Sequence, residues 1–101
     1  MNMHLSKKQI EEIRHSCRKL QVKSLFAFGS VVSDTYRLDS DIDMLVDFTV
    51  RDPLEYADRY FTLKQRLELI LNRPVDLLES KALKNPFLQA EIDRSKVSIY
   101  G

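Results

Sequence analysis

Two carboxylates separated by one residue are the feature of this chain with the clearest chemistry. Asp41 and Asp43 stand at the start of the apolar run 42–48, which has the composition of a buried strand. Residues two apart on a strand point to the same face, about 6–7 Å apart along it. Two converging carboxylates repel each other and lose hydration, so they need a cation, and hard oxygen ligands favour Mg²⁺ or Mn²⁺. The pair therefore predicts a divalent metal site that serves a nucleoside triphosphate.

A glycine and a serine precede this pair. Gly29 and Ser30 follow the apolar run 25–28, which we expect to form a covered central strand. Glycine permits a positive φ and a close approach of the backbone, and serine can cap the next helix. A Gly-Ser pair alone is most often just a turn, and an Asp-x-Asp before a strand is often a solvated loop. Only their order and spacing together point to an active site.

The full pattern, Gly29-Ser30, ten residues, then Asp41-Ile42-Asp43, resembles the signature of the DNA polymerase β-like nucleotidyltransferase superfamily. The resemblance covers about the whole chain, because the minimal nucleotidyltransferase branch consists of one catalytic domain of about this length. It implies an α/β fold, a small mixed sheet flanked by helices. A chain of 101 residues can bury one modest core. We therefore expect residues 1–101 to form a single minimal nucleotidyltransferase domain.

The resemblance also implies a third acidic residue on a later strand. The short apolar segment 74–79 carries Asp76 at the matching position and ends in Glu79, next to Ser80. Glu79 competes for the same role. Because Asp76 lies inside the apolar run and Glu79 ends it, we expect Asp76 to complete the triad and Glu79 to be solvated.

The roles of these residues follow from the resemblance. Gly29 and Ser30 would contact the β- and γ-phosphates of ATP, while Asp41 and Asp43 would hold the Mg²⁺ that bridges the triphosphate oxygens. Asp76 would share a second Mg²⁺ and lower the pKa of the acceptor hydroxyl. An in-line attack on the α-phosphorus then releases pyrophosphate and leaves AMP on the acceptor.

A positive side chain should accompany the metals, since a triphosphate carries about four negative charges. Many relatives have an arginine directly after the serine, but this chain has Val31 and Val32 there. Arg37 is the nearest cation within the motif. We therefore assign Arg37 to the triphosphate.

Composition narrows the choice of partner and compartment. A formal net charge of +1 gives no broad basic field for nonspecific nucleic-acid binding, so templated polymerisation is not expected. The single cysteine, Cys17, excludes an intramolecular disulfide and a cysteine-based zinc site. The first residues lack the apolar core of a signal peptide, and no apolar run is long enough to span a membrane. We expect a cytoplasmic protein.

Helix and strand signals alternate along the chain without linkers or repeats. In the longest helix, apolar residues at helical spacing predict the buried face: Ala57, Tyr60, Phe61, Leu67, Ile70 and Leu71. The remaining signals are a helix capped by Ser6 with Gln9, strands over 25–28, 42–48 and around Asp76, a helix from Asp52 to about Leu71, a short helix opened by Asn85-Pro86, and an edge strand or docked terminus over 97–100.

Three classes of function fit these patterns. The resemblance implies an antitoxin that transfers AMP to a tyrosine of a HEPN-domain toxin. The second class is a binding module that inhibits the toxin sterically, which the intact triad argues against. The third is a transferase for a small molecule such as an aminoglycoside. The known enzymes of this kind add an acceptor-binding domain, for which the chain is too short.

Overall fold

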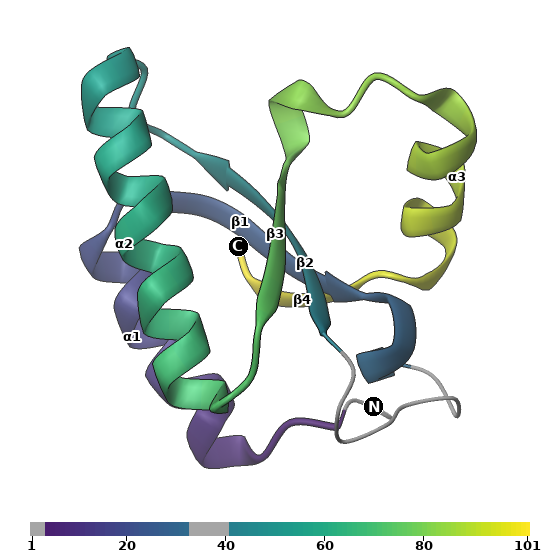
Figure 1. Ribbon diagram of the computed structural model, residues 1–101, viewed down its shortest axis with the longest axis horizontal. Helices are drawn as coiled ribbons and strands as arrows, with labels where there is room; N and C mark the ends of the chain where they lie inside the picture. Colours follow the sequence, from purple (N-terminus) through teal and green to yellow (C-terminus); the bar gives the residue numbers. More distant parts are fainter. Residues whose placement is uncertain (1–3, 33–40) are drawn as a thin grey trace.

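The elements of the fold alternate between helix and strand, as the sequence predicts. The computed structural model describes residues 4–32 and 41–101. Figure 1 shows α1 (Lys7–Lys19), β1 (Val22–Phe28), the 3₁₀ turn η1 (Gly29–Val32), β2 (Ile42–Phe48), α2 (Pro53–Leu71), β3 (Val75–Glu79), the 3₁₀ turn η2 (Ser80–Ala82), α3 (Pro86–Ser95) and β4 (Val97–Tyr100).

The four strands form one mixed sheet in the order β3-β2-β1-β4. β1 runs antiparallel to both β2 and β4, whereas β2 and β3 are parallel. A parallel pair needs a crossover connection, and α2 provides it. β4 pairs only with β1, which confirms the predicted edge strand. The predicted small mixed sheet flanked by helices is therefore correct.

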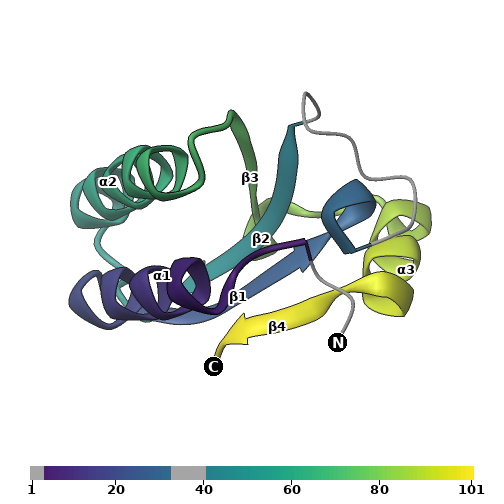
Figure 2. The same cartoon turned by 90° about the horizontal axis from the view of Figure 1, so that it is seen from below.

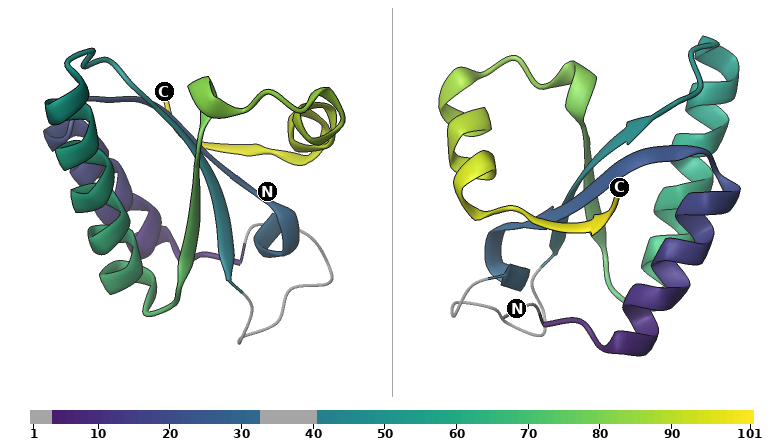
Figure 3. Two further views of the ribbon diagram at one scale, coloured as in Figure 1. Left: turned by 45° about the horizontal axis from the view of Figure 1, so that its top comes forward. Right: turned by 180° about the vertical axis from the view of Figure 1, so that it is seen from behind.

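The two faces of the sheet are covered differently. α1 and α2 lie together over one face, and α3 lies on the other side, near η1 (Figures 2 and 3). Alternation along β2 sends Met44 and Val46 into the core under α1 and α2, while Leu45 packs with Ile92 of α3. No helix within the described ranges is long and apolar enough to cross a membrane.

The start of α1 follows the predicted capping box. The Ser6 hydroxyl accepts a hydrogen bond from the Gln9 backbone at 3.1 Å, and the Gln9 side chain accepts one from the Ser6 backbone at 2.9 Å. Ile13 and Cys17 are fully buried on the inner face of the helix. Burial raises the pKa of the Cys17 thiol to about 12, so this cysteine is part of the core.

The bounds of α2 are as predicted, and its predicted buried face is correct for Tyr60, Leu67, Ile70 and Leu71 but wrong for two residues. Asp52 caps the helix by accepting a hydrogen bond from the Glu55 backbone at 3.2 Å, and the helix ends at Leu71. Phe61 was expected to be buried, yet its side chain is 63% exposed, and Ala57 is exposed as well. Successive helical residues point about 100° apart, so a helix that turns Tyr60 inward must turn Phe61 away. The residues of α2 that pack in or against the core are Tyr56, Tyr60, Leu63, Leu67, Ile70 and Leu71.

Candidate active site

Two of the three predicted acids meet because β2 and β3 pair in parallel. The register sets Asp43 directly opposite Asp76, on strands that lie about 4.8 Å apart. Met44 and Leu77, the next residues of the two strands, are buried in the core beneath α1 and α2. The two carboxylates therefore share the opposite face, where Asp43 is half-buried and Asp76 is exposed.

The surroundings of Asp43 disfavour the ionised form of its carboxyl group. Burial raises the pKa of its carboxyl above the usual value, and the negative charges of Asp76 and Asp41 raise it further. Asp41 precedes β2 and is exposed, yet it is close enough to act on Asp43. A cation between these groups would favour their ionised forms. The predicted triad therefore forms an electrostatic cluster.

The donor chemistry of this cluster suits Mg²⁺. Carboxylate oxygens are hard ligands, and Mg²⁺ in nucleotide sites is usually held by one or two carboxylates together with substrate phosphates and waters. Within residues 4–32 and 41–101, no three acidic, histidine or cysteine side chains form a ready cage for an ion. The protein's own ligands thus fit a metal that arrives with a triphosphate better than one bound in a closed site.

Gly29 lies directly against the Asp43 carboxylate. Its φ of +74° belongs to the region that side chains disfavour. A Cβ atom at this position would stand 2.5 Å from Oδ2 of Asp43. The neighbouring residue Phe28 pairs with Asp43 in the antiparallel register of β1 and β2. Glycine is therefore required here both by the backbone and by the space that Asp43 occupies.

Substitution of this glycine gives a first prediction. Gly29→Ala should destabilise the protein by about 1 kcal/mol or more, because alanine is strained at a positive φ. It should also lower nucleotide transfer at least tenfold, because the new methyl group displaces the Asp43 carboxylate. Denaturant unfolding and a transfer assay measure the two effects. Ser30→Ala is the matched control, since it leaves Asp43 in place and should cost less on both counts. Wild-type transfer by Gly29→Ala would contradict this account.

The rest of the predicted phosphate site is only partly described. Ser30 lies in η1, directly after the glycine, and is half-buried. Val31, at the position where many relatives have arginine, is fully buried in the core, so this position presents no group to a phosphate. Arg37 lies outside the described residues.

Glu79 lies on the other face of the sheet from the acids. It pairs with Val46, a core residue under α1 and α2. The expectation that Glu79 is solvated was wrong, because it is half-buried. Burial raises the phenol pKa of Tyr56 and of Tyr60, and the Glu79 charge raises each further. Because it pairs with Val46, Glu79 lies on the face of the sheet under α1 and α2, opposite the face that carries Asp43 and Asp76.

The tyrosines of α2 contribute to the core. The Tyr60 hydroxyl donates to the Leu77 carbonyl at 2.6 Å, and the Tyr56 ring meets Phe48 edge-on at 5.1 Å. Both tyrosine side chains therefore pack between α2 and the sheet. Phe61, by contrast, is exposed.

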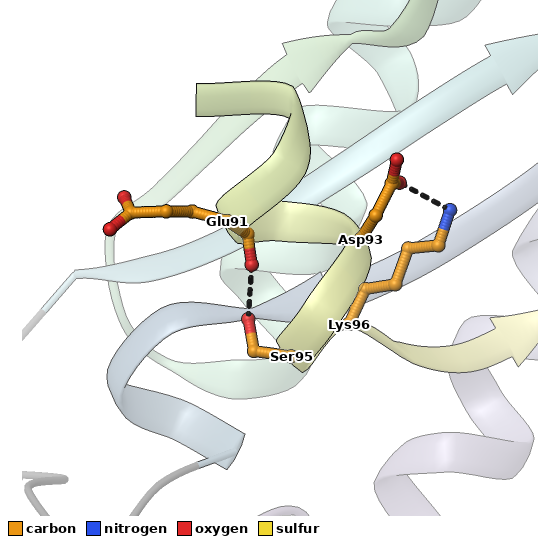
Figure 4. Close-up of polar contacts among 4 residues, drawn as sticks. All are labelled: Glu91, Asp93, Ser95 and Lys96. Carbon is orange, nitrogen blue, oxygen red and sulfur yellow. Dashed lines mark hydrogen bonds and ion pairs between the residues drawn. The ribbon is translucent and has the colours of Figure 1, made fainter. Parts of the chain in front are cut away.

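A groove beside the glycine was missed by sequence analysis. It has a volume of about 420 Å³ and lies between the end of β1 and α3. Figure 4 shows the last turn of α3, which forms one of its walls. More than fifty residues separate the two walls in the sequence, and no local pattern marks their meeting. The lining residues are Phe28, Gly29, Leu88, Glu91, Ile92, Arg94 and Ser95.

Comparisons with known proteins agree with this geometry. The profile of the family described as "Nucleotidyltransferase domain" matches residues 10–99. A candidate protein adenylyltransferase from Methanocaldococcus jannaschii is 30% identical over 96 residues, which cover 90% of this chain and 95% of that protein. The protein adenylyltransferase MntA from Thermococcus cleftensis is 34% identical over 64 residues, or 63% of this chain and 62% of MntA.

Solved structures show the same fold. A candidate minimal nucleotidyltransferase superposes with a TM-score of 0.71 at 30% identity, over 90% of this chain and 89% of that one. The antitoxin of a toxin–antitoxin complex with AMP-PNP gives 0.70 at 22% identity, over 91% and 73%. The MNT antitoxin in complex with a tri-AMPylated HEPN toxin of Shewanella oneidensis gives 0.66 at 19% identity, over 96% and 73%.

Proposed function

The chain belongs to the nucleotidyltransferase domain family, and from that membership we propose that it transfers AMP from ATP to a tyrosine of a HEPN-domain toxin, thereby neutralising it. We further propose that residues 1–101 act as a single minimal domain. The observation that carries the proposal is the register that sets Asp43 opposite Asp76, with the Gly29 turn against the Asp43 carboxylate.

The relatives support the choice of a protein as acceptor. The Methanocaldococcus jannaschii relative, of which this chain covers nearly the whole length, carries the name of a protein adenylyltransferase. Among proteins of the same fold, one antitoxin accompanies AMP-PNP and another accompanies an AMPylated HEPN toxin. Those structures are 22% identical or less, so the toxin partner is our proposal for this chain.

The residues would divide the reaction between them. Asp41 and Asp43 would hold Mg²⁺, which when bound neutralises charge on the triphosphate and polarises the α-phosphate. Backbone N–H groups of the Gly29 turn and the Ser30 hydroxyl would contact the β- and γ-phosphates. Gly29 lies against the Asp43 carboxylate, so one triphosphate could contact the turn and the metal together.

Asp76 would act on the acceptor. It is exposed beside the half-buried Asp43, so a hydroxyl delivered by another protein can reach it. The acceptor oxygen bonds to the α-phosphorus as the bond between that phosphorus and the bridging oxygen breaks, and pyrophosphate leaves. The hydroxyl proton passes to the Asp76 carboxylate. Contacts with the partner would position the hydroxyl, which lowers the entropic cost of the attack.

Intact-mass spectrometry tests the proposal. The chain is mixed with a candidate HEPN-domain toxin, Mg²⁺ and ATP, and the toxin should become heavier by one or more AMP units on tyrosine. The variant in which both Asp41 and Asp43 are replaced by asparagine is the control and should add none. If that variant neutralises the toxin fully at equimolar protein while the wild type adds no nucleotide, the inhibition is steric and the enzymatic proposal is wrong.

A further inference from the structure

The groove between η1 and α3 contains a positive side chain that no predicted site includes. We infer that Arg94 of α3 binds the β- and γ-phosphates of the nucleotide, in place of the arginine that many relatives have after the serine. The inference rests on the proposed function, because it concerns the same nucleotide. It assigns to α3 a part in substrate binding.

The placement of Arg94 follows from the packing of α3. Ile92 is buried against Phe28 and Leu45, which fixes the helix on the face of the sheet that carries the acids. α3 also contacts η1. Arg94 and Gly29 line the same groove, and a Cβ atom on Gly29 would stand 2.5 Å from Oδ2 of Asp43. A triphosphate that runs from Asp43 along the glycine turn would therefore reach Arg94 with its terminal phosphates.

The charge of the site calls for such a residue. Three carboxylates and a triphosphate of about four negative charges exceed what two divalent ions neutralise. Arginine suits the position because its planar guanidinium can donate two parallel hydrogen bonds to phosphate oxygens. Val31 cannot supply this charge, since it is apolar and buried.

Two of the lysines described on this side of the sheet are engaged elsewhere. The Lys96 ammonium forms an ion pair with Asp93 at 2.9 Å (Figure 4), and it lies 4.4 Å from the centre of the Phe26 ring. Lys81 is 3.8 Å from an oxygen of Asp47. Within residues 4–32 and 41–101, no ion pair or hydrogen bond involves the guanidinium of Arg94.

Glu91 lines the same groove as Arg94 and carries the opposite charge. In Figure 4 its carboxylate extends away from the Asp93–Lys96 pair, and the residue lines the groove beside Gly29. Its negative charge should oppose a phosphate there. Removing it should therefore have the opposite effect to removing Arg94.

Binding measurements on the whole chain test the inference without an activity assay. Calorimetry is run with MgATP and with AMP on the wild type, Arg94→Gln, Arg94→Lys and Glu91→Gln. Arg94→Gln should weaken MgATP binding about tenfold or more, the scale of a lost charged hydrogen bond. AMP has no β- or γ-phosphate, so its affinity should change less than about twofold. Arg94→Lys should recover part of the loss, and Glu91→Gln should tighten MgATP binding.

The measurements distinguish a failure of this inference from a failure of the proposed function. Arg51→Gln, an exposed arginine ahead of α2, is the control for a general loss of positive charge, and thermal unfolding checks that each variant is folded. If folded Arg94→Gln binds MgATP as the wild type does, or loses ATP and AMP affinity equally, the inference is wrong while the proposed function stands. If the wild type itself does not bind MgATP, the proposed function fails.

Discussion

Replacing Asp41 and Asp43 together by asparagine is expected to abolish AMP transfer and to remove most of the Mg²⁺-dependent affinity for ATP. The two carboxylates lie at the start of β2, where the charges of Asp41 and Asp76 already act on the half-buried Asp43. Asparagine keeps the shape of each side chain but removes the charge that attracts a divalent ion. Metal stabilisation of the transition state is worth several kcal/mol, so the loss of transfer should be about a thousandfold or more.

Calorimetry with and without EDTA measures the binding part of this prediction. ATP should bind the wild type tightly with Mg²⁺ and weakly with EDTA, and the double variant should bind weakly in both. Asp47→Asn is the matched control. Asp47 lies on the same strand, about 13 Å further along, and its charge is paired with Lys81 at 3.8 Å. Suppose instead that the wild type in EDTA and the double variant in Mg²⁺ both bind ATP as tightly as the wild type does in Mg²⁺. That result would show that Mg²⁺ does not link these carboxylates to ATP.

The parts of the fold that short segments determine were predictable. Ser6 and Gln9 define the start of α1 through hydrogen bonds between residues three apart, and Asp52 with Pro53 defines the start of α2 in the same local way. Such signals depend on a few neighbouring residues. The bounds of β2, and the end of α2 at Leu71, were equally well marked.

Features that depend on packing between distant segments were not predictable from the sequence. Hydrophobicity alone did not show that Phe61 faces solvent, since the inward direction of α2 is set by the residues it meets on the sheet. The face on which Glu79 lies was predictable from the sequence. Glu79 is the third residue after Asp76, and alternation along a strand places residues at odd spacing on opposite faces. The observed pairing of Glu79 with Val46 agrees with that rule.

Some residues of the candidate site are likewise predictable from nearby sequence, and others depend on how distant segments pack. Gly29, Ser30, Asp41 and Asp43 are near one another in the sequence, so their spacing alone indicates a nucleotide site. Asp76 was expected from the resemblance, and the parallel register of β2 and β3 adds that it lies opposite Asp43. Arg94 needed the docking of α3 beside η1, and its distance of sixty-five residues from Gly29 leaves no pattern to detect.

Asp76→Asn should separate substrate binding from chemistry. Asp76 lies on β3, beyond Asp43 from the Gly29 turn, and its exposure places it toward an incoming acceptor. If it accepts the proton of the acceptor hydroxyl, its amide variant should lower AMP transfer about a hundredfold or more, which is the scale of a lost general base. MgATP affinity should change little, because in the proposed mechanism the Gly29 turn and the β2 acids would hold the triphosphate.

Single-turnover transfer to the toxin and calorimetry with MgATP measure these two quantities on the same preparations. Glu79→Gln is the decisive control, because Glu79 is on the same strand but on the helix-covered face of the sheet. It should retain both transfer and ATP binding. Asp41→Asn, by comparison, should lower both. If Asp76→Asn and Asp41→Asn lose ATP affinity equally, Asp76 is a ligand of the nucleotide-bound metal and the acceptor must be activated by another group. If Glu79→Gln loses transfer while Asp76→Asn keeps it, the third acid is Glu79 and the register of β3 must change when substrate binds.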